Sequence, residues 1–487
     1  MAKQTASRTK TRARTSGTGG ARRAAPVSKP RSSGTGKKIG SEEITTYTTA
    51  VRYLMNRTDV ERMRVIRRDD TFKLDRMRAL LQELGNPQDQ IKTVHVAGTV
   101  GKGSTVAMIS AMLRECGYAV GEYTSPHLID LRERIRIGGQ LIDRPGFTEL
   151  MKAVAQAAEA INEEPTYFEV LTALAFRHFA EEAVDIAIIE TGLGGRLDST
   201  NVITPEVSVI TRIALDHERL LGDTVEAIAR EKAGIMKPDV PALIFDQGPE
   251  VEEVFRSVAE EVGARLQVVN KDIEFSNRFC STSELGPHTR VCLYSDSSRF
   301  EHLPVPLAGT HQATNCGLAL AVVDMLKNCG FDCPENLVTI GLDKTKINGR
   351  MELVWDQPRI LVDGAHNPEA LGALMKCVGA HVPYDSMVCV FGCCQDKEID
   401  AMLDMMNFGA DKVIFTKAST NPRAADPLDL QKAFSERSGK MSQTAASLPE
   451  ALELAARAVG REDLLCVTGS FYLVGETMKH LEKSRQG

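Results

Sequence analysis

A glycine-rich stretch at residues 98–105 carries the residues best suited to chemistry. It reads Gly-Thr-Val-Gly-Lys-Gly-Ser-Thr and lies between the apolar run 93–97 and a second apolar run that begins at Val106. Glycines let a backbone turn bring consecutive N–H groups onto an anion, and a following helix adds the positive end of its dipole. Lys102 adds positive charge, and Ser104 has a hydroxyl placed to reach Mg²⁺. The stretch predicts a nucleotide phosphate site, although its spacing is shorter than in the common P-loop; a plain glycine turn before a helix is the alternative.

Polar groups also follow three later apolar runs, each near the point where the run ends. Ser125 follows the run 118–123, Glu190 follows 184–189, and His217 comes shortly after 207–211. Ligands of parallel sheets bind beyond the carboxyl ends of the strands, so these groups are expected to face the phosphate loop. Mg²⁺ takes few protein ligands beside phosphate oxygens and water. The pattern predicts a metal site with Glu190 as first ligand; His217 taken alone would be a structural histidine, but imidazole beside a carboxylate can ligate metal.

The spacing alone does not decide the roles of three further residues. Lys232 lies in a helical stretch, where a lysine is by default solvated on the helix face. Arg350 and His366 stand at turns or strand ends, where a nucleotide or a second substrate could be held. Neither a structural nor a functional role is excluded for any of the three.

The net charge of −6 hides a strongly basic first segment. Residues 1–40 contain 11 basic residues and no acidic ones, so the rest of the chain is acidic. An acidic body is a poor non-specific partner for nucleic acid, which leaves only the tail to touch a polyanion. The tail is too polar to fold alone and is expected to be disordered. Organelle targeting and polyanion binding stay open for it beside the favoured role of a solubilising tail.

The cysteine spacing and the lengths of the apolar runs indicate the cellular compartment in which the protein is expected. The 11 cysteines lack the paired CxxC or histidine spacing of a zinc site and form no disulfide framework in a chain of 487 residues. They are expected to be reduced, which favours a reducing compartment. No apolar run reaches the roughly 18 residues of a membrane span. We expect a cytoplasmic, monomeric protein with small-molecule substrates and no membrane partner.

Apolar runs alternate with helical stretches, which is typical of a parallel sheet covered on both faces. A chain of this length is expected to form two or three domains. The alternation resumes at Gly309, with strands expected at 360–362, 387–391, 412–415 and 464–467. We predict an α/β protein: a disordered basic tail (1–40), a P-loop ATPase domain with a mostly parallel sheet (41–305), and a smaller Rossmann-like α/β domain (306–487).

Many short motifs occur in a fixed order from about Phe72 to Glu476. They include LGNPQ (84–88), HVAGTVGKGST (95–105), YTSPHL (123–128), TYFEVLTALAF (166–176), ETGLGGRLDSTNVI (190–203), EKAGIMKP (231–238), HQATN (311–315), GRMELV (349–354), DGAHNP (363–368) and TGSFYLVGE (468–476). In this order they resemble the Mur-ligase-like ATP-dependent amide-forming ligases, specifically the folylpolyglutamate and dihydrofolate synthases. The resemblance implies ATP, two Mg²⁺ ions, L-glutamate and a dihydropteroate or folate acceptor.

The resemblance also assigns roles to residues. It implies ATP contacts at Thr99, Gly101, Lys102, Gly103, Ser104, Asn315, Arg350 and Asp363, and metal ligands at Ser104, Ser125, Glu190 and His217. The pteridine side matches Thr166, Tyr167, Phe168, Glu169, Leu197, Asp198 and Ser199, and the glutamate side matches His366 and Ser470. Lys102, Lys232 and His366 match catalytic positions. Lys232 matches the family lysine that is carbamylated, which would turn an ammonium into an anionic metal ligand.

The sequence departs from the family pattern at four positions. Val100 replaces the usual asparagine of the phosphate loop, Arg212 and Ala214 stand where serine and glycine are usual, and Thr310 stands where arginine often precedes His-Gln. These changes concern fine geometry near the phosphates and leave the phosphate and metal residues in place.

The resemblance implies that the acceptor carboxylate attacks the γ-phosphate of ATP and that the glutamate amine then attacks the resulting acyl phosphate. Positioning and electrostatics supply most of the catalysis of phosphoryl transfer. Two rival functions are a peptidoglycan-precursor ligase of the same superfamily and a nucleic-acid-associated nucleotide-binding protein that acts through the basic tail. The short span before the phosphate loop disfavours the first rival, because those ligases carry an additional amino-terminal domain.

Overall fold

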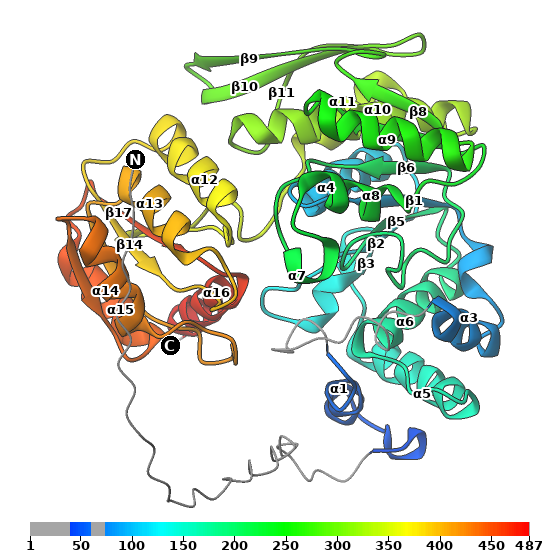
Figure 1. Ribbon diagram of the computed structural model, residues 1–487, viewed down its shortest axis with the longest axis horizontal. Helices are drawn as coiled ribbons and strands as arrows, with labels where there is room; N and C mark the ends of the chain where they lie inside the picture. The colour runs from blue at the N-terminus through cyan, green and yellow to red at the C-terminus, as the bar shows by residue number, and fades with distance from the viewer. Residues whose placement is uncertain (1–38, 60–73, 487) are drawn as a thin grey trace, which may run out of the picture. The chain divides into compact units, whose positions relative to one another are not determined.

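The computed structural model describes residues 39–59 and 74–486 (Figure 1). The expected basic tail therefore lies outside the described residues, apart from Ile39 and Gly40. Within the described chain, strands form three sheets of eight, three and six strands. The prediction of an α/β protein with a large, mostly parallel sheet and a second sheet domain is confirmed.

The eight-stranded sheet carries the phosphate loop at the end of a central strand. Its strand order is β4 (Gln140–Leu141), β3 (Ile135–Ile137), β2 (Val120–Tyr123), β5 (Ile186–Glu190), β1 (Thr93–Ala97), β6 (Val207–Ile210), β7 (Pro241–Phe245) and β8 (Arg265–Val269). The β2–β3 and β3–β4 pairs are antiparallel, and the other neighbours pair parallel. The carboxyl ends of the parallel strands therefore share one edge, as the runs before Ser125, Glu190 and His217 predicted.

Helices cover both faces of this sheet. On β5, Ile186 and Ile188 join one hydrophobic cluster while Ala187 and Ile189 join another, because successive side chains of a strand point to opposite faces. The first cluster takes in α4 (Lys102–Glu115), α10 (Thr310–Asn328) and α11 (Glu335–Asp343). The opposite face packs against α1 (Tyr47–Met55), α3 (Leu74–Glu83), α5 (Arg144–Ala160), α6 (Tyr167–Glu181), α8 (Val225–Ala233) and α9 (Pro249–Val262).

A three-stranded antiparallel sheet extends the first cluster. It consists of β9 (Glu274–Thr282), β10 (Gly286–Tyr294) and β11 (Arg299–Pro304), and it contributes Val291, Leu293 and Phe300 to the core that holds α4 and α10. Its long hairpin also reaches α12 (Pro368–His381), where His381 Nδ1 lies 2.8 Å from Pro287 O.

The six-stranded sheet follows later in the chain. Its order is β12 (Glu352–Asp356), β13 (Arg359–Val362), β17 (Leu464–Thr468), β14 (Met387–Phe391), β15 (Lys412–Phe415) and β16 (Met441–Thr444), with only the β12–β13 pair antiparallel. One face packs against α12, α13 (Ile399–Gly409) and α14 (Pro427–Arg437); the other packs against α15 (Leu448–Ala458) and α16 (Phe471–Gln486). The four strands expected after Gly309 are confirmed as β13, β14, β15 and β17.

Packing also bears on where the first domain ends. The α10 and α11 side chains, among them Leu320 and Val338, lie in the same core as β1 and β5, whereas the second sheet begins at Glu352. We therefore propose a domain boundary between Asp343 and Glu352, later than the expected boundary at residue 305. Among the described helices, none has the length and hydropathy to cross a bilayer.

Candidate functional site

The phosphate loop joins β1 to α4 and is shaped by two glycines. Gly98 and Gly101 have φ angles of 147° and 95°, which L side chains rarely adopt. A Cβ on Gly98 would lie 1.8 Å from Thr211 Oγ1, and a Cβ on Gly101 would lie 2.3 Å from Asn315 Oδ1. Neither position has room for a side chain. Asn315, an expected nucleotide contact on α10, lies directly against the loop.

Backbone bonding shows which N–H groups of the loop are already used. Thr99 N and Val100 N donate to Arg212 O at 2.9 and 3.1 Å, and Val100 and Arg212 form an isolated β-bridge. Two of the departures from the family sequence are thus joined to each other. The N–H groups that α4 leaves for an anion are those of its first turn, beginning at Lys102, where no intrahelical acceptor exists.

Glu190 ends β5 beside this turn and is almost fully buried, with 3% of its surface exposed. Its Oε2 accepts a hydrogen bond from Ser125 N at 3.2 Å, and its Oε1 lies 3.8 Å from Lys102 Nζ. Burial raises the pKa of the Glu190 carboxyl, and the Lys102 charge and the Ser125 N–H only partly oppose this. The carboxylate is therefore short of compensating positive charge, which suits it to a cation ligand.

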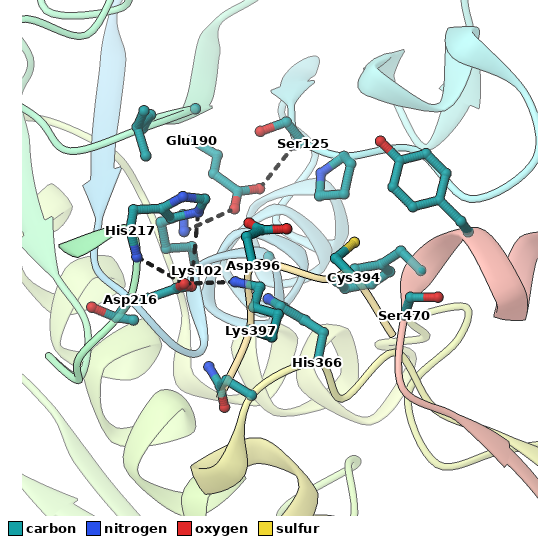
Figure 2. Close-up of a pocket in the computed structure, with 18 of the residues that line it drawn as sticks. Lys102, Ser125, Glu190, Asp216, His217, His366, Cys394, Asp396, Lys397 and Ser470 are labelled. Carbon is teal, nitrogen blue, oxygen red and sulfur yellow. Dashed lines mark hydrogen bonds and ion pairs between the residues drawn. The ribbon is translucent and has the colours of Figure 1, made fainter. Parts of the chain in front are cut away.

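His217 and Asp216 follow β6 on the other side of β1. Asp216 Oδ1 accepts from Lys397 Nζ of the second domain at 2.7 Å, and its Oδ2 lies 3.8 Å from His217 Nε2 (Figure 2). Although burial opposes it, the neighbouring His217 and the Lys397 ammonium lower the pKa of the Asp216 carboxyl. The His217 side chain is 42% exposed, yet desolvation lowers its pKa to about 4 in spite of Asp216. The imidazole is thus neutral near pH 7 and able to ligate a metal.

Lys232 lies at the end of α8 and is not a solvated lysine, since only 4% of its surface is exposed. Its Nζ donates to Gly98 O at 2.8 Å, so it contacts the phosphate loop itself. Burial, assisted by the Lys102 charge, lowers the pKa of Lys232 to about 7. The loop after β5 packs tightly on this helix end, because a Cβ on Gly195 would lie 2.8 Å from Lys232 O.

The expected pteridine residues lie in two segments, 166–169 and 197–199, and both segments line the cavity that also contains Glu190 and Lys232. Thr166 caps α6: its Oγ1 accepts from Glu169 N at 3.3 Å, and its own N donates to Glu169 Oε2 at 2.7 Å. Glu169 is also held by Arg76 Nε of α3 at 2.9 and 3.1 Å, with both side chains buried. Asp198 belongs to the loop after β5, and its oxygens accept from Leu193 N and Thr200 N at 2.8 and 3.0 Å.

Replacing Arg76 with methionine is expected to destabilise the protein, because it leaves the Glu169 carboxylate buried without its ion-pair partner. Breaking a buried pair of this kind costs about 3–5 kcal/mol. Urea unfolding of both proteins measures the difference. The control is Arg78→Met on the same helix, since Arg78 is 60% exposed and pairs with exposed Asp75; a change beyond about 0.5 kcal/mol is not expected there. Equal losses in the two variants would contradict the prediction.

The second domain brings its own residues to the cavity. Arg350 lies 4.7 Å over the Phe471 ring, and His366 Nδ1 is 2.9 Å from Gly364 O. Burial, with the Lys397 charge, lowers the pKa of His366 to about 4, so this imidazole is neutral. Asp363 instead points at the backbone, accepting from Met351 N and Ala365 N at 2.9 and 2.8 Å.

Residues of both domains line one cavity of about 980 Å³. Of the expected site residues, the following line it: Thr99, Gly101, Lys102, Gly103, Ser125, Thr166, Tyr167, Phe168, Glu169, Glu190, Leu197, Asp198, Ser199, His217, Lys232, Arg350, His366 and Ser470. Ser104, Asn315 and Asp363 do not line it. Ser104 is buried in the first turn of α4. Asn315 is also buried, and its side chain packs against Gly101 of the phosphate loop.

Lys397 and Arg134 are among the lining residues to which the sequence analysis assigned no role. Lys397, 12% exposed, pairs with Asp216 and follows β14, so it belongs to a polar group at the end of a strand. Arg134 is 1% exposed and donates from Nε to His127 Nδ1 at 2.9 Å. A buried arginine in a short 3₁₀ helix carries no sequence signal that separates it from a surface arginine.

No group of three or more His, Cys, Asp or Glu side chains in the described chain is arranged to hold a metal ion.

Two protein-family models match this sequence. The Mur ligase middle domain matches residues 96–323, and the Mur ligase, glutamate ligase domain matches residues 349–471. The dihydrofolate synthase/folylpolyglutamate synthase of Bacillus subtilis is 36% identical over 416 residues, covering 84% of this chain and 95% of that protein. The folylpolyglutamate synthase of Lacticaseibacillus casei is 33% identical over 412 residues, or 83% and 94% of the two chains.

Solved structures of folylpolyglutamate synthases are also similar to this chain. The Mycobacterium tuberculosis folylpolyglutamate synthase complexed with ADP superposes with a TM-score of 0.81 at 31% identity, covering 90% of this chain and 98% of that one. The E. coli FolC in complex with DHPP and ADP gives a TM-score of 0.80 at 30% identity, covering 92% and 100%.

Proposed function

Because the chain belongs to the folylpolyglutamate and dihydrofolate synthases, a family of ATP-dependent ligases within the Mur ligase superfamily, we propose that its cavity joins L-glutamate to a pteroyl or folyl carboxylate. The observation that carries this proposal is the shared cavity itself. A phosphate loop, a buried carboxylate at a strand end and polar residues of a second domain line one space of about 980 Å³.

The reaction proceeds in two displacements. The acceptor carboxylate attacks the γ-phosphorus of ATP, ADP leaves, and an acyl phosphate forms. The glutamate amine then attacks the acyl carbon, and phosphate leaves as the amide forms. Lys102 and the N–H groups of the first turn of α4 offset charge on the phosphoryl oxygens, and the walls from both domains limit the access of water to the acyl phosphate.

The family implies Mg²⁺, and the residues fit it. Glu190 is a buried carboxylate whose positive neighbours do not restore its ordinary pKa, and His217 is a neutral imidazole in the same cavity. Glu190, His217 and the Ser125 hydroxyl line the cavity and would hold one or two ions, and Ser104, which is buried in the first turn of α4, is proposed as a further ligand. When bound, Mg²⁺ neutralises charge on the transferring phosphoryl group.

Carbamylation of Lys232 is part of the proposal. Reaction with CO₂ needs the neutral amine, and a lysine with a pKa of about 7 is substantially neutral at physiological pH. The product is an anionic oxygen ligand, of the kind that hard cations prefer. Lys232 also lines the cavity and touches the phosphate loop, so such a group would lie near the metal residues.

Purified protein is expected to sustain ADP release over many turnovers only when ATP, Mg²⁺, L-glutamate and a pteroyl acceptor are all present, because the acyl phosphate forms only on a bound acceptor and is consumed by the glutamate amine. Coupled ADP assays with dihydropteroate and with tetrahydrofolate in turn separate the dihydrofolate synthase from the folylpolyglutamate synthase activity. Absence of ADP release with both acceptors would contradict the proposal. Consumption of a uridine-linked muramyl substrate instead would support a peptidoglycan-precursor ligase. The expectation of a monomer stays a prediction.

A further inference from the structure

A buried chain of hydrogen bonds connects β1 to the loop that carries Asp198. His95 lies on β1 with none of its surface exposed, and its Nε2 is 2.8 Å from Thr200 Oγ1. Thr200, also fully buried, donates from Oγ1 to Asp198 Oδ1 at 2.5 Å and from its backbone N to the same oxygen at 3.0 Å. The network thus runs from the strand that leads into the phosphate loop to a carboxylate on the cavity wall.

The position of each proton in the His95–Thr200–Asp198 network follows from counting its hydrogen-bond donors. Thr200 has one hydroxyl proton and gives it to Asp198, so the contact with His95 requires Nε2–H as donor. The other ring nitrogen, Nδ1, has no hydrogen-bond partner among the described residues, which agrees with a bare lone pair facing the core. Burial lowers the pKa of His95 to about 3, and the Lys237 charge acts in the same direction. His95 is a neutral, fixed donor.

Asp198 receives donors on both oxygens. Thr200 occupies Oδ1, and Leu193 N donates to Oδ2 at 2.8 Å. Asp198 is 4% exposed and lines the cavity between Leu197 and Ser199. Arg196 lies in the same loop, two residues before Asp198, and its N donates to the O of Glu231, the residue next to Lys232. Hydrogen bonds from within the protein therefore fix the orientation of the Asp198 carboxylate, and Asp198 also lines the cavity.

We propose that Thr200 and His95 are positioning residues for the acceptor: they hold the Asp198 carboxylate at the angle from which it accepts N–H donors of a flat heterocycle such as a pteridine. Neither residue lines the cavity. Their effect on binding is exerted through Asp198. This inference rests on the proposed function, because it takes the acceptor to meet Asp198.

The test compares Thr200→Val, which keeps the shape and removes the hydroxyl, with Thr200→Ser, which keeps the hydroxyl. Thr200→Val is expected to raise the KM for the pteroyl acceptor about tenfold, the effect of losing a hydrogen bond to a charged group. The KM for ATP stays within about twofold, and Thr200→Ser restores the acceptor KM. Thr93→Val is the matched control on β1, since Thr93 is buried and its Oγ1 has no partner in the described chain.

A second variant decides the matter if Thr200→Val does not fold. His95→Leu leaves the Thr200–Asp198 bonds in place and removes only the donor to Thr200, so a rise in acceptor KM of about threefold is expected, again without change in the KM for ATP. Folding is checked by ADP binding. An unchanged acceptor KM in a folded variant, or equal changes in both KM values, would overturn the inference. Lack of ADP release by the wild-type protein would instead overturn the proposed function.

Discussion

Replacing Glu190 with glutamine is expected to lower ligase turnover by roughly 10³-fold, the size of effect seen when a group that stabilises transition-state charge is removed. Glutamine keeps the shape of the side chain but removes the negative charge that lies 3.8 Å from Lys102 Nζ. If Glu190 holds the cation, the variant also needs a higher Mg²⁺ concentration for half-maximal rate. The measurement is ADP release as a function of Mg²⁺, and His217→Ala is expected to behave in the same way.

Glu122→Gln provides the matched control. Glu122 is a buried glutamate on the neighbouring strand β2, its pKa is likewise raised by burial, and it pairs with Arg114 at 3.1 Å outside the cavity. Its turnover and Mg²⁺ requirement are expected to stay near those of the wild type. Thermal melts of all variants separate lost catalysis from lost folding. Wild-type turnover with an unchanged Mg²⁺ requirement in Glu190→Gln would remove this residue from the metal site.

Replacing Lys232 with alanine is expected to reduce turnover by roughly 10²–10³-fold and to be partly rescued by a small added carboxylate such as formate. The alanine leaves a gap beside Gly98 O in which a carboxylate could supply the missing anionic oxygen. Lys232→Arg keeps a positive charge and fills the gap, so formate is not expected to rescue it. ADP-release rates with and without formate measure both effects.

The pH dependence has a definite sign. The pKa of Lys232 is lowered to about 7, so the neutral amine that reacts with CO₂ gains population as the pH rises through about 7 and is lost below it. Carbon-13 NMR with labelled bicarbonate near pH 8 is expected to show one carbamate signal that Lys232→Ala lacks. Lys237→Ala is the control, because Lys237 also has a lowered pKa but does not line the cavity. A free ammonium at Lys232 in active, bicarbonate-equilibrated protein would contradict carbamylation.

Local sequence was sufficient for the parts of the site that depend on neighbouring residues. The run 184–189 predicted a buried strand, and Glu190 follows at its carboxyl end as expected. The glycines at 98 and 101 predicted a tight turn, and both have the positive φ angles that such a turn requires. Periodicity and turn chemistry reflect contacts within a few residues, which a single sequence displays directly.

Other features depended on contacts between distant segments. Spacing left Lys232 as a solvated lysine, but the packing of α8 under the loop after β5 buries it against Gly98, 134 residues away in sequence. Similarly, the α10 and α11 helices continue the first core although they follow the expected boundary at 305.

The sequence by itself therefore determined the α/β class, the tight glycine turn between β1 and α4 and the edge of the sheet at which polar groups gather. The tertiary structure alone decided that Lys397 meets Asp216 across the two domains, that Asp363 accepts from the backbone N–H groups of Met351 and Ala365, and that His95 supports Asp198 through Thr200. Which distant side chains meet is set by how helices and strands pack around the cores, and a pattern of types and spacing along one chain does not contain that geometry.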